Sequence, residues 1–174
     1  MKEARLPAGQ LSTGRDRRTR IKTPLRQGTL TKTQLAALRL ALSSVPFAKL
    51  LGIELTAAEV GSATLRLKIR RHHKQIQGVM HGGAIASLID TATAFAIVTL
   101  LARGELFTTV DLTVNYLRPL TEGAATATSR VLRAGRRLIT VSADVLDDSG
   151  NLAATALSTY LRLSSGPPGH SFLT

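Results

Sequence analysis

Residues 78–102 read GVMHGGAIASLIDTATAFAIVTLLA, and this stretch decides how the rest of the chain is organised. It opens with Gly78, Gly82 and Gly83 around His81, a composition typical of a turn or loop. From residue 84 to residue 102 it contains no glycine or proline, and almost every side chain is apolar or small. A helix that is apolar on all sides is buried in a core or spans a membrane, because an exposed helix needs a polar face. The stretch therefore predicts a long buried helix that follows a glycine-rich loop.

A membrane span is the alternative, since residues 82–102 have about the length that a bilayer requires. The segment carries Asp90 near its middle, however, and the sequence after it alternates as in the strands of a soluble protein. No apolar stretch follows the basic N-terminus, so the sequence predicts no secretory signal. We therefore expect no membrane segment and a cytoplasmic protein.

Asp90 is the only charged residue of the predicted helix. Burying a carboxylate without a partner costs roughly several kcal/mol, so this side chain must be hydrogen-bonded, neutralised or functional. In a structural interpretation Asp90 bonds to nearby threonine hydroxyls. In a functional interpretation it is a reactive group, and the residues alone leave both interpretations open.

The loop before the helix offers backbone donors. The first amides of a helix have no intrahelical partner and lie at the positive end of the helix dipole. Gly82 and Gly83 would let a carbonyl or an oxyanion of a ligand come close to these amides, as in an oxyanion hole. The same glycines also suit a turn that merely starts the helix.

The spacing of these groups has a consequence for assembly. Asp90 lies seven residues after Gly83, which corresponds to about 10.5 Å along a helix axis. Both groups cannot therefore act on one carbonyl from the same chain. If they serve one reaction, two copies of the chain must pack their helices antiparallel about a two-fold axis. The functional interpretation thus predicts a homodimer with its sites at the interface.

Composition limits the class of protein. The 174-residue chain has a net charge of +12 and no cysteine, which excludes disulfides, thiol nucleophiles and cysteine-ligated metals. His72 and His73 would point apart in an extended loop, so we expect no metal site. Half of the excess charge lies in residues 1–30, which lack hydrophobic periodicity. The rest suits an anionic partner such as a phosphorylated ligand.

These features predict a flexible basic tail over residues 1–30, one domain over 31–164 and a flexible tail over 165–174. A targeting segment and a tether to nucleic acid are the alternatives for the basic tail. The tail lacks the apolar residues that a helix-turn-helix needs, so we expect no nucleic-acid partner.

Within the domain, the pattern predicts a short helix, one or two strands, the long helix and then four strands. Thr33 can cap the first helix, which ends before Pro46. Strands are expected from residue 61 and over 106–118, 124–133, 138–146 and 152–163. In the 106–118 strand, strict alternation puts Val110, Leu112, Val114 and Tyr116 on one face and Thr109, Asp111, Thr113 and Asn115 on the other. This order predicts an α+β fold in which an antiparallel sheet covers a single helix.

The motifs resemble those of hotdog-fold acyl-CoA thioesterases of the phenylacetic-acid-degradation type. The resemblance covers about residues 34–163. It includes Gly52-Ile53, Gly61, the run Gly78-Val79-Met80-His81-Gly82-Gly83, the acid nine residues after His81, and TVDLTVNYLRP at 109–119. It implies a five- or six-stranded antiparallel sheet wrapped around the helix, and dimers formed through the sheets, often paired again as dimers of dimers.

The resemblance also implies roles for single residues. Asp90 occupies the position of the nucleophile or general base, and the amide of Gly83 or Gly82 polarises the thioester carbonyl from the other subunit. Thr109 matches a hydroxyl that helps to hold the attacking water, and His81 orients the loop. Gln75 stands where these enzymes commonly carry asparagine, and its extra methylene points to altered substrate preference or weak activity. No cofactor is implied, since CoA is part of the substrate.

Basic residues near the expected cleft suit the phosphates of CoA, although each alone is more often a solvated surface charge. The candidates are Arg118, Arg133, Arg136, Arg137, His73 and Lys74. An aspartate rather than a glutamate as the acid favours a phenylacetyl or medium-chain acyl group. A non-catalytic sensor of acyl-CoA is the alternative. A hotdog hydratase is disfavoured, because such enzymes carry histidine five residues after the aspartate and this chain has Phe95 there.

Overall fold

The structure, a computed structural model, describes residues 28–102 and 104–163. Residues 1–27 of the tail expected over 1–30, and the whole of the tail expected over 165–174, lie outside this range. The elements, in chain order, are α1 (Lys32–Ser44), α2 (Pro46–Leu51), β1 (Ile53–Glu59), β2 (Ser62–Lys68), η1 (Arg71–His73), α3 (Gly82–Val98), β3 (Leu106–Tyr116), β4 (Ala124–Ala134), β5 (Leu138–Leu146) and β6 (Leu152–Leu163).

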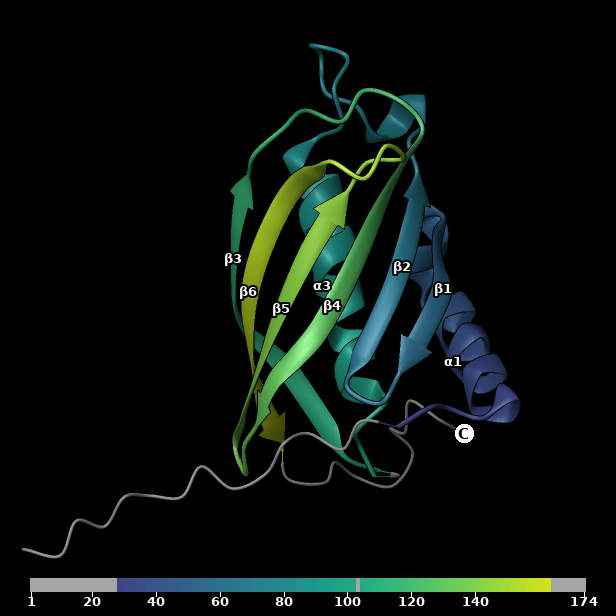
Figure 1. Cartoon of the computed structure of the whole chain (residues 1–174), viewed down its shortest axis with the longest axis vertical. Coiled ribbons are helices and arrows are strands. Elements are labelled where there is room, and N and C mark those ends of the chain that lie inside the picture. The colour runs from purple at the N-terminus through teal and green to yellow at the C-terminus, as the bar shows by residue number, and fades with distance from the viewer. Residues whose placement is uncertain (1–27, 103, 164–174) are drawn as a thin grey trace, which may run out of the picture.

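The strands form one six-stranded antiparallel sheet in the order β1-β2-β4-β5-β6-β3. Figure 1 shows this sheet curved around α3, with α1 beside β1 and with β3 at the opposite edge. The expected α+β architecture, an antiparallel sheet around one long central helix, is confirmed. The first of the expected strands is in fact a pair, because residues 53–59 form a strand of their own.

Helix α1 begins two residues earlier than the sequence suggested. Thr31, rather than Thr33, is its N-cap: Thr31 Oγ1 accepts from Gln34 N at 3.2 Å, and Gln34 Oε1 accepts from Thr31 N at 2.9 Å. The prediction of Thr33 was wrong because the glutamine that completes this capping box lies three residues after Thr31. The helix ends at Ser44, before Pro46, as expected. Gly28 O already accepts a hydrogen bond from Val60 N at 3.0 Å, so contacts with the domain begin before residue 31.

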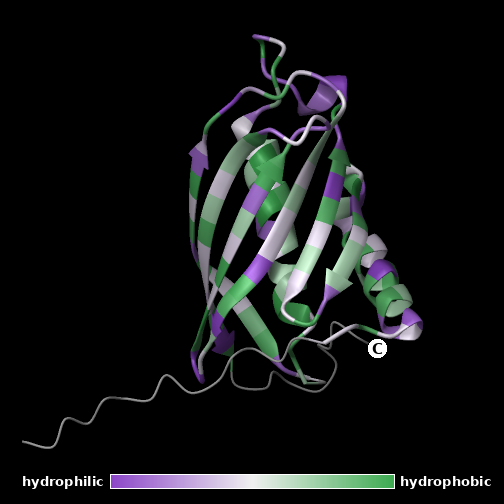
Figure 2. Ribbon diagram, viewed as in Figure 1, coloured by the Kyte–Doolittle hydropathy of each residue, from purple (hydrophilic) through white to green (hydrophobic). Residues whose placement is uncertain are grey.

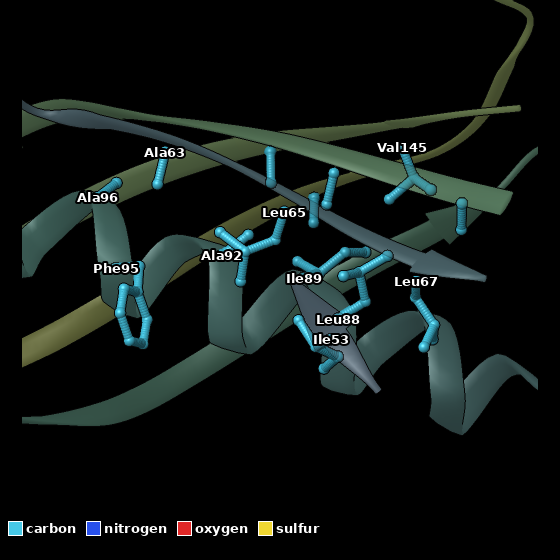
Figure 3. Packing of buried hydrophobic residues seen from close by; sticks show 14 of the residues in the cluster. Ile53, Ala63, Leu65, Leu67, Leu88, Ile89, Ala92, Phe95, Ala96 and Val145 are labelled. Carbon is cyan, nitrogen blue, oxygen red and sulfur yellow. The ribbon is translucent and has the colours of Figure 1, made fainter. Parts of the chain in front are cut away.

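The core lies between the sheet and α3. Leu65 and Val145 on the strands and Ile89 and Ala92 on the helix are fully buried and belong to one apolar cluster, part of which Figure 3 shows. Figure 2 shows the apolar length of α3 in green and the alternation of green with paler or purple residues along the strands. The helix is thus buried by the sheet, as its composition requires. Among the described residues, no helix has the length and hydropathy that crossing a bilayer requires.

Strand β3 contains a β-bulge that the sequence pattern did not reveal. Its register with β6 shifts between Thr109 and Asp111, so Thr109 and Val110 together occupy the place opposite Tyr160. Val110 is 60% exposed, whereas Leu112 and Val114 pack against the core. The expected alternation, with Val110 on the face of Leu112 and Thr109 on the opposite face, was therefore wrong. The bulge instead turns the Thr109 side chain toward α3.

Candidate active site

Asp90 lies in the middle of α3 and is half-buried. Two hydroxyls reach its carboxylate: Thr109 Oγ1 donates to Oδ1 at 3.0 Å, and Tyr160 OH lies 3.2 Å from the same oxygen. Among the residues that the structure describes, neither a hydrogen-bond donor nor a cation contacts Oδ2. One carboxylate oxygen is thus fixed by the sheet, and the other is available to a ligand or water.

Tyr160 is a site residue that sequence reasoning missed. It lies on β6, and its side chain is only 1% exposed. Its ring packs edge to face on Phe107, and its hydroxyl lies 2.6 Å from Thr93 Oγ1. The sequence did show a tyrosine, which carries a polar hydroxyl, on the apolar face of the 152–163 strand. A buried tyrosine hydroxyl requires a hydrogen-bond partner, so this position indicated a polar contact in the core.

The Tyr160 hydroxyl remains protonated near neutral pH. Burial, and then the negative charge of Asp90, raise the pKa of Tyr160 to about 12, while the hydroxyls of Thr93, Thr109 and Ser158 oppose the shift. A protonated phenol is a donor, and the ionised carboxylate beside it can only accept. The pair is therefore matched for a charge-assisted hydrogen bond.

The glycine-rich loop caps the N-terminus of α3. His81 is the N-cap, and its Nδ1 accepts a 2.9 Å hydrogen bond from the amide of Gly83. This bond occupies one of the two amides expected to polarise a carbonyl. The amide of Gly82 has no hydrogen-bond partner among the described residues, so it is the open donor at this helix end. Tyr116 OH donates to Gly82 O at 3.0 Å and steadies the same peptide.

A pocket of about 280 Å³ opens beside this helix end. Three of the expected site residues line it, namely Gln75, Gly82 and Arg118. The remaining wall is mainly apolar and consists of Val79, Met80, Ile85, Tyr116, Leu117, Pro119 and Leu120. A pocket lined by several apolar residues together with a few polar groups is typical of a small-molecule site.

Asp90 and Thr109 do not line this pocket. Asp90 lies eight residues after Gly82, which is about 12 Å along α3. The structure therefore separates the expected site into two halves within one chain. One half holds the open amide and the pocket, and the other holds the hydroxyl-bonded carboxylate.

The expected phosphate-binding residues also fall into groups. Arg118 lies at the pocket. Three others lie at the opposite end of the sheet, where β3 begins and Tyr160 is paired. They are Arg133 at the end of β4, and Arg136 and Arg137 in the turn before β5. Lys74 is half-buried and forms an isolated bridge with Met80.

His73 is buried, so it does not lie at a surface where it could contact the phosphates of CoA. Its side chain is 2% exposed, its Nδ1 accepts from Arg70 N at 3.1 Å, and its carbonyl accepts from His81 N at 2.8 Å. Burial lowers the pKa of His73, and the nearby charge of His72 adds to this shift. The sequence suggested an extended loop here, but the turn η1 folds the imidazole inward. His73 therefore supports the loop that carries His81.

Within the described part of the chain, no three His, Cys, Asp or Glu side chains are grouped so that they could hold a metal ion. The chemistry that the arrangement offers is that of a carboxylate, hydroxyls and a backbone amide. A carboxylate with one free oxygen can act as a general base or a nucleophile, and an unpaired helix amide can stabilise an oxyanion.

Comparisons with known proteins identify the family of the chain. A family model described as the thioesterase superfamily matches residues 77–154. A putative esterase of Saccharolobus solfataricus is 34% identical over 111 residues, which cover 64% of this chain and 73% of that protein. The medium/long-chain acyl-CoA thioesterase YigI of Escherichia coli is 33% identical over 132 residues, covering 67% of this chain and 85% of its own.

A solved structure of the phenylacetic acid degradation protein PaaI from Thermus thermophilus, in a mutant form, has the same fold. Its TM-score is 0.62 at 28% identity, and the match covers 68% of this chain and 99% of that chain. The matched region contains the helix α3, the Gly82 amide and Asp90. The chain therefore belongs to the thioesterase superfamily and, within it, to the PaaI-like hotdog-fold thioester hydrolases.

Proposed function

We propose that this protein hydrolyses an acyl-CoA thioester to the free acid and CoA, with Asp90 as the catalytic carboxylate. The observation that carries the proposal is the state of Asp90: Oδ1 is held by two hydroxyls, and Oδ2 is free of partners in the described chain. A general base or a nucleophile requires a carboxylate that is held in position and has one oxygen accessible to water or substrate.

The reaction can follow either of two courses. As a general base, Oδ2 takes a proton from water, and the hydroxide attacks the thioester carbonyl. As a nucleophile, Oδ2 attacks the carbonyl itself to give a mixed anhydride, which water then hydrolyses. In both courses the tetrahedral oxyanion accepts a hydrogen bond from the Gly82 amide, and its collapse expels the CoA thiolate.

The site is proposed to form between two subunits, because about 12 Å of helix separates Gly82 from Asp90 in one chain. Two copies of α3 packed antiparallel about a two-fold axis bring the Gly82 end of one to the Asp90 region of the other. Strand β3 supports this assembly. It is an 11-residue edge strand, and an open edge of that length is a template for pairing with a second copy. A further pairing into a dimer of dimers extends the same proposal.

The basic residues fit this assembly. In an antiparallel pair, Arg133, Arg136 and Arg137 of one subunit approach the end of α3 at which Gly82 and Arg118 of the other lie. We propose that these arginines, with Lys74, bind the phosphates of CoA. Gln75 lines the pocket beside Gly82, where its amide can orient the carbonyl or the water. The reaction requires no cofactor, since CoA enters with the substrate.

The acyl group is proposed to be aromatic, such as phenylacetyl, or of medium chain length. The apolar lining and the volume of about 280 Å³ suit either. The similarity to a medium/long-chain acyl-CoA thioesterase supports the aliphatic choice, and the similarity to a phenylacetic acid degradation protein supports the aromatic one.

The test measures release of the CoA thiol from phenylacetyl-, benzoyl-, hexanoyl- and lauroyl-CoA by the wild type and by Asp90→Asn. We expect hydrolysis of at least one ester and a fall of about two or more orders of magnitude in the variant. Activity that survives the substitution would make Asp90 structural. Binding of CoA esters without any hydrolysis would instead favour the non-catalytic sensor.

A further inference from the structure

Tyr160 makes a contact that a core-filling residue does not need. Its ring is enclosed between β3 and β5 and packs on Phe107, and a phenylalanine would fill the same space. Only the hydroxyl distinguishes the two side chains. That hydroxyl lies within hydrogen-bond distance of three atoms of α3: Thr93 Oγ1 at 2.6 Å, Asp90 O at 3.1 Å and Asp90 Oδ1 at 3.2 Å.

The direction of these hydrogen bonds follows from the number of protons. Tyr160 has one hydroxyl proton, and Asp90 Oδ1 can only accept when the carboxylate is ionised. Thr93 Oγ1 has three acceptors within reach: the phenol oxygen at 2.6 Å, and Ile89 O and Asp90 O at 3.0 Å each. A bond to a charged acceptor is roughly twice as strong as one between neutral groups, so the Tyr160 proton is directed to Asp90.

The two hydroxyls on Oδ1 come from neighbouring strands, since the bulge places Thr109 opposite Tyr160. Thr109 is exposed and Tyr160 is fully buried. A carboxylate held by two donors on one oxygen cannot rotate freely about its Cβ–Cγ bond. We propose that Tyr160 is a positioning residue of the reaction, which holds the Asp90 carboxylate with Oδ2 open to the thioester. The proposal rests on the proposed role of Asp90 and adds a residue that touches neither substrate nor water.

Tyr160→Phe tests this directly. We expect kcat to fall about 10- to 100-fold, with KM within about twofold, because one hydrogen bond to a charged group is lost while the pocket is untouched. A fall in kcat with KM unchanged is the result that a merely core-filling role of Tyr160 would not give. Ser129→Ala is the matched control. It removes another fully buried hydroxyl that contacts α3, 2.7 Å from Ala92 O, away from Asp90.

A readout that does not depend on activity separates this proposal from the proposed function. The ¹³C carboxyl signal of Asp90, assigned by its absence in Asp90→Asn, should change its chemical shift at neutral pH in Tyr160→Phe, because the carboxylate loses one of its two hydroxyl donors. Replacing Tyr160 by a fluorotyrosine provides a second measurement, in which the side chain keeps nearly the same shape. In a Tyr116→Phe background Tyr160 is the only tyrosine, and a more acidic phenol, being a stronger donor, should also shift the Asp90 carboxyl signal.

The outcomes are distinct. A loss of stability in both Tyr160→Phe and Ser129→Ala, with kcat unchanged in both, would make Tyr160 a core residue only and overturn the proposal. An Asp90 carboxyl signal that moves in neither experiment would overturn it as well. A wild type that hydrolyses no acyl-CoA would contradict the proposed function, and the carboxyl signal would still decide whether Tyr160 donates to Asp90.

Discussion

Thr109 and Asp90 are 19 residues apart in the chain, and Thr109 Oγ1 donates a 3.0 Å hydrogen bond to Asp90 Oδ1. The contact exists because the bulge in β3 turns Thr109 toward α3, against the alternation of the strand. A feature of strand pairing thus completes the surroundings of a carboxylate on the central helix.

We expect Thr109→Val to lower kcat about 10- to 100-fold, because it removes a donor to a charged acceptor. The free energy of unfolding should change by no more than about 0.5 kcal/mol, since Thr109 is exposed. Steady-state kinetics and chemical denaturation measure both quantities. Thr113→Val is the control, because Thr113 lies on the same strand and its hydroxyl bonds to Asp111 instead. An equal loss of activity in both variants would contradict the specific role of Thr109.

Gly82→Pro removes the one open amide at the start of α3. Gly82 is the first helical residue, a position that accepts proline, and His81 before it is already extended at φ −65° and ψ 135°. Gly82→Ala is the matched control, because its Cβ meets the same Tyr116 ring at 3.3 Å but keeps the amide. We expect kcat to fall about 10²- to 10³-fold more in the proline variant. Equal kcat values would assign the oxyanion to another donor.

His81 is expected to act through the cap that it provides. His81→Ala should lower the free energy of unfolding by about 1 kcal/mol, the usual cost of a lost N-cap. His81→Asn should restore most of the stability and most of the activity, because asparagine is a good N-cap. Thermal denaturation and kcat/KM are measured on both variants. Restored stability with activity still about 100-fold low would show that the imidazole takes part in the chemistry.

The buried His73 predicts a pH dependence of stability. Burial lowers its pKa from the ordinary value of 6.5, so the unfolded chain binds this proton more tightly than the folded one. Its contribution is therefore fully present above pH 6.5 and is lost as the pH falls from there toward the lowered folded value. Asp147, whose pKa is lowered by the side chain and backbone of Asn151, loses its contribution only below pH 3.8.

Melting temperatures measured from about pH 7 to pH 5 should fall for the wild type and fall less for His73→Asn, which cannot take up a proton. The asparagine can still accept from Arg70 N. Identical slopes for the two proteins would show that His73 does not titrate in this range.

Much of the fold could be predicted because its signals are local. Residues 138–146 and 152–163 form strands over the expected ranges, since period-two alternation and the turn at 147–151 are both in the sequence. The buried helix begins at Gly82, where the glycines and His81 indicated a helix start. These elements could be predicted without knowing which segments they pack against.

The features that were missed depend on pairing between distant segments. The bulge at Val110 is a property of the register between β3 and β6, which alternation along one strand cannot reveal. The inward turn of His73 depends on its contacts with Arg70 and with the loop at His81. The bond between Tyr160 and Asp90 joins residues 70 positions apart.

The central claim is that Gly82 of one subunit and Asp90 of the other form one site. The most direct measurement is the activity of a mixed dimer, purified through two different tags after co-expression of Gly82→Pro and Asp90→Asn. One of its two sites keeps both groups intact, so we predict about half of the wild-type kcat per dimer although each parent is nearly inactive. A mixed dimer no more active than its parents would contradict a site shared between subunits.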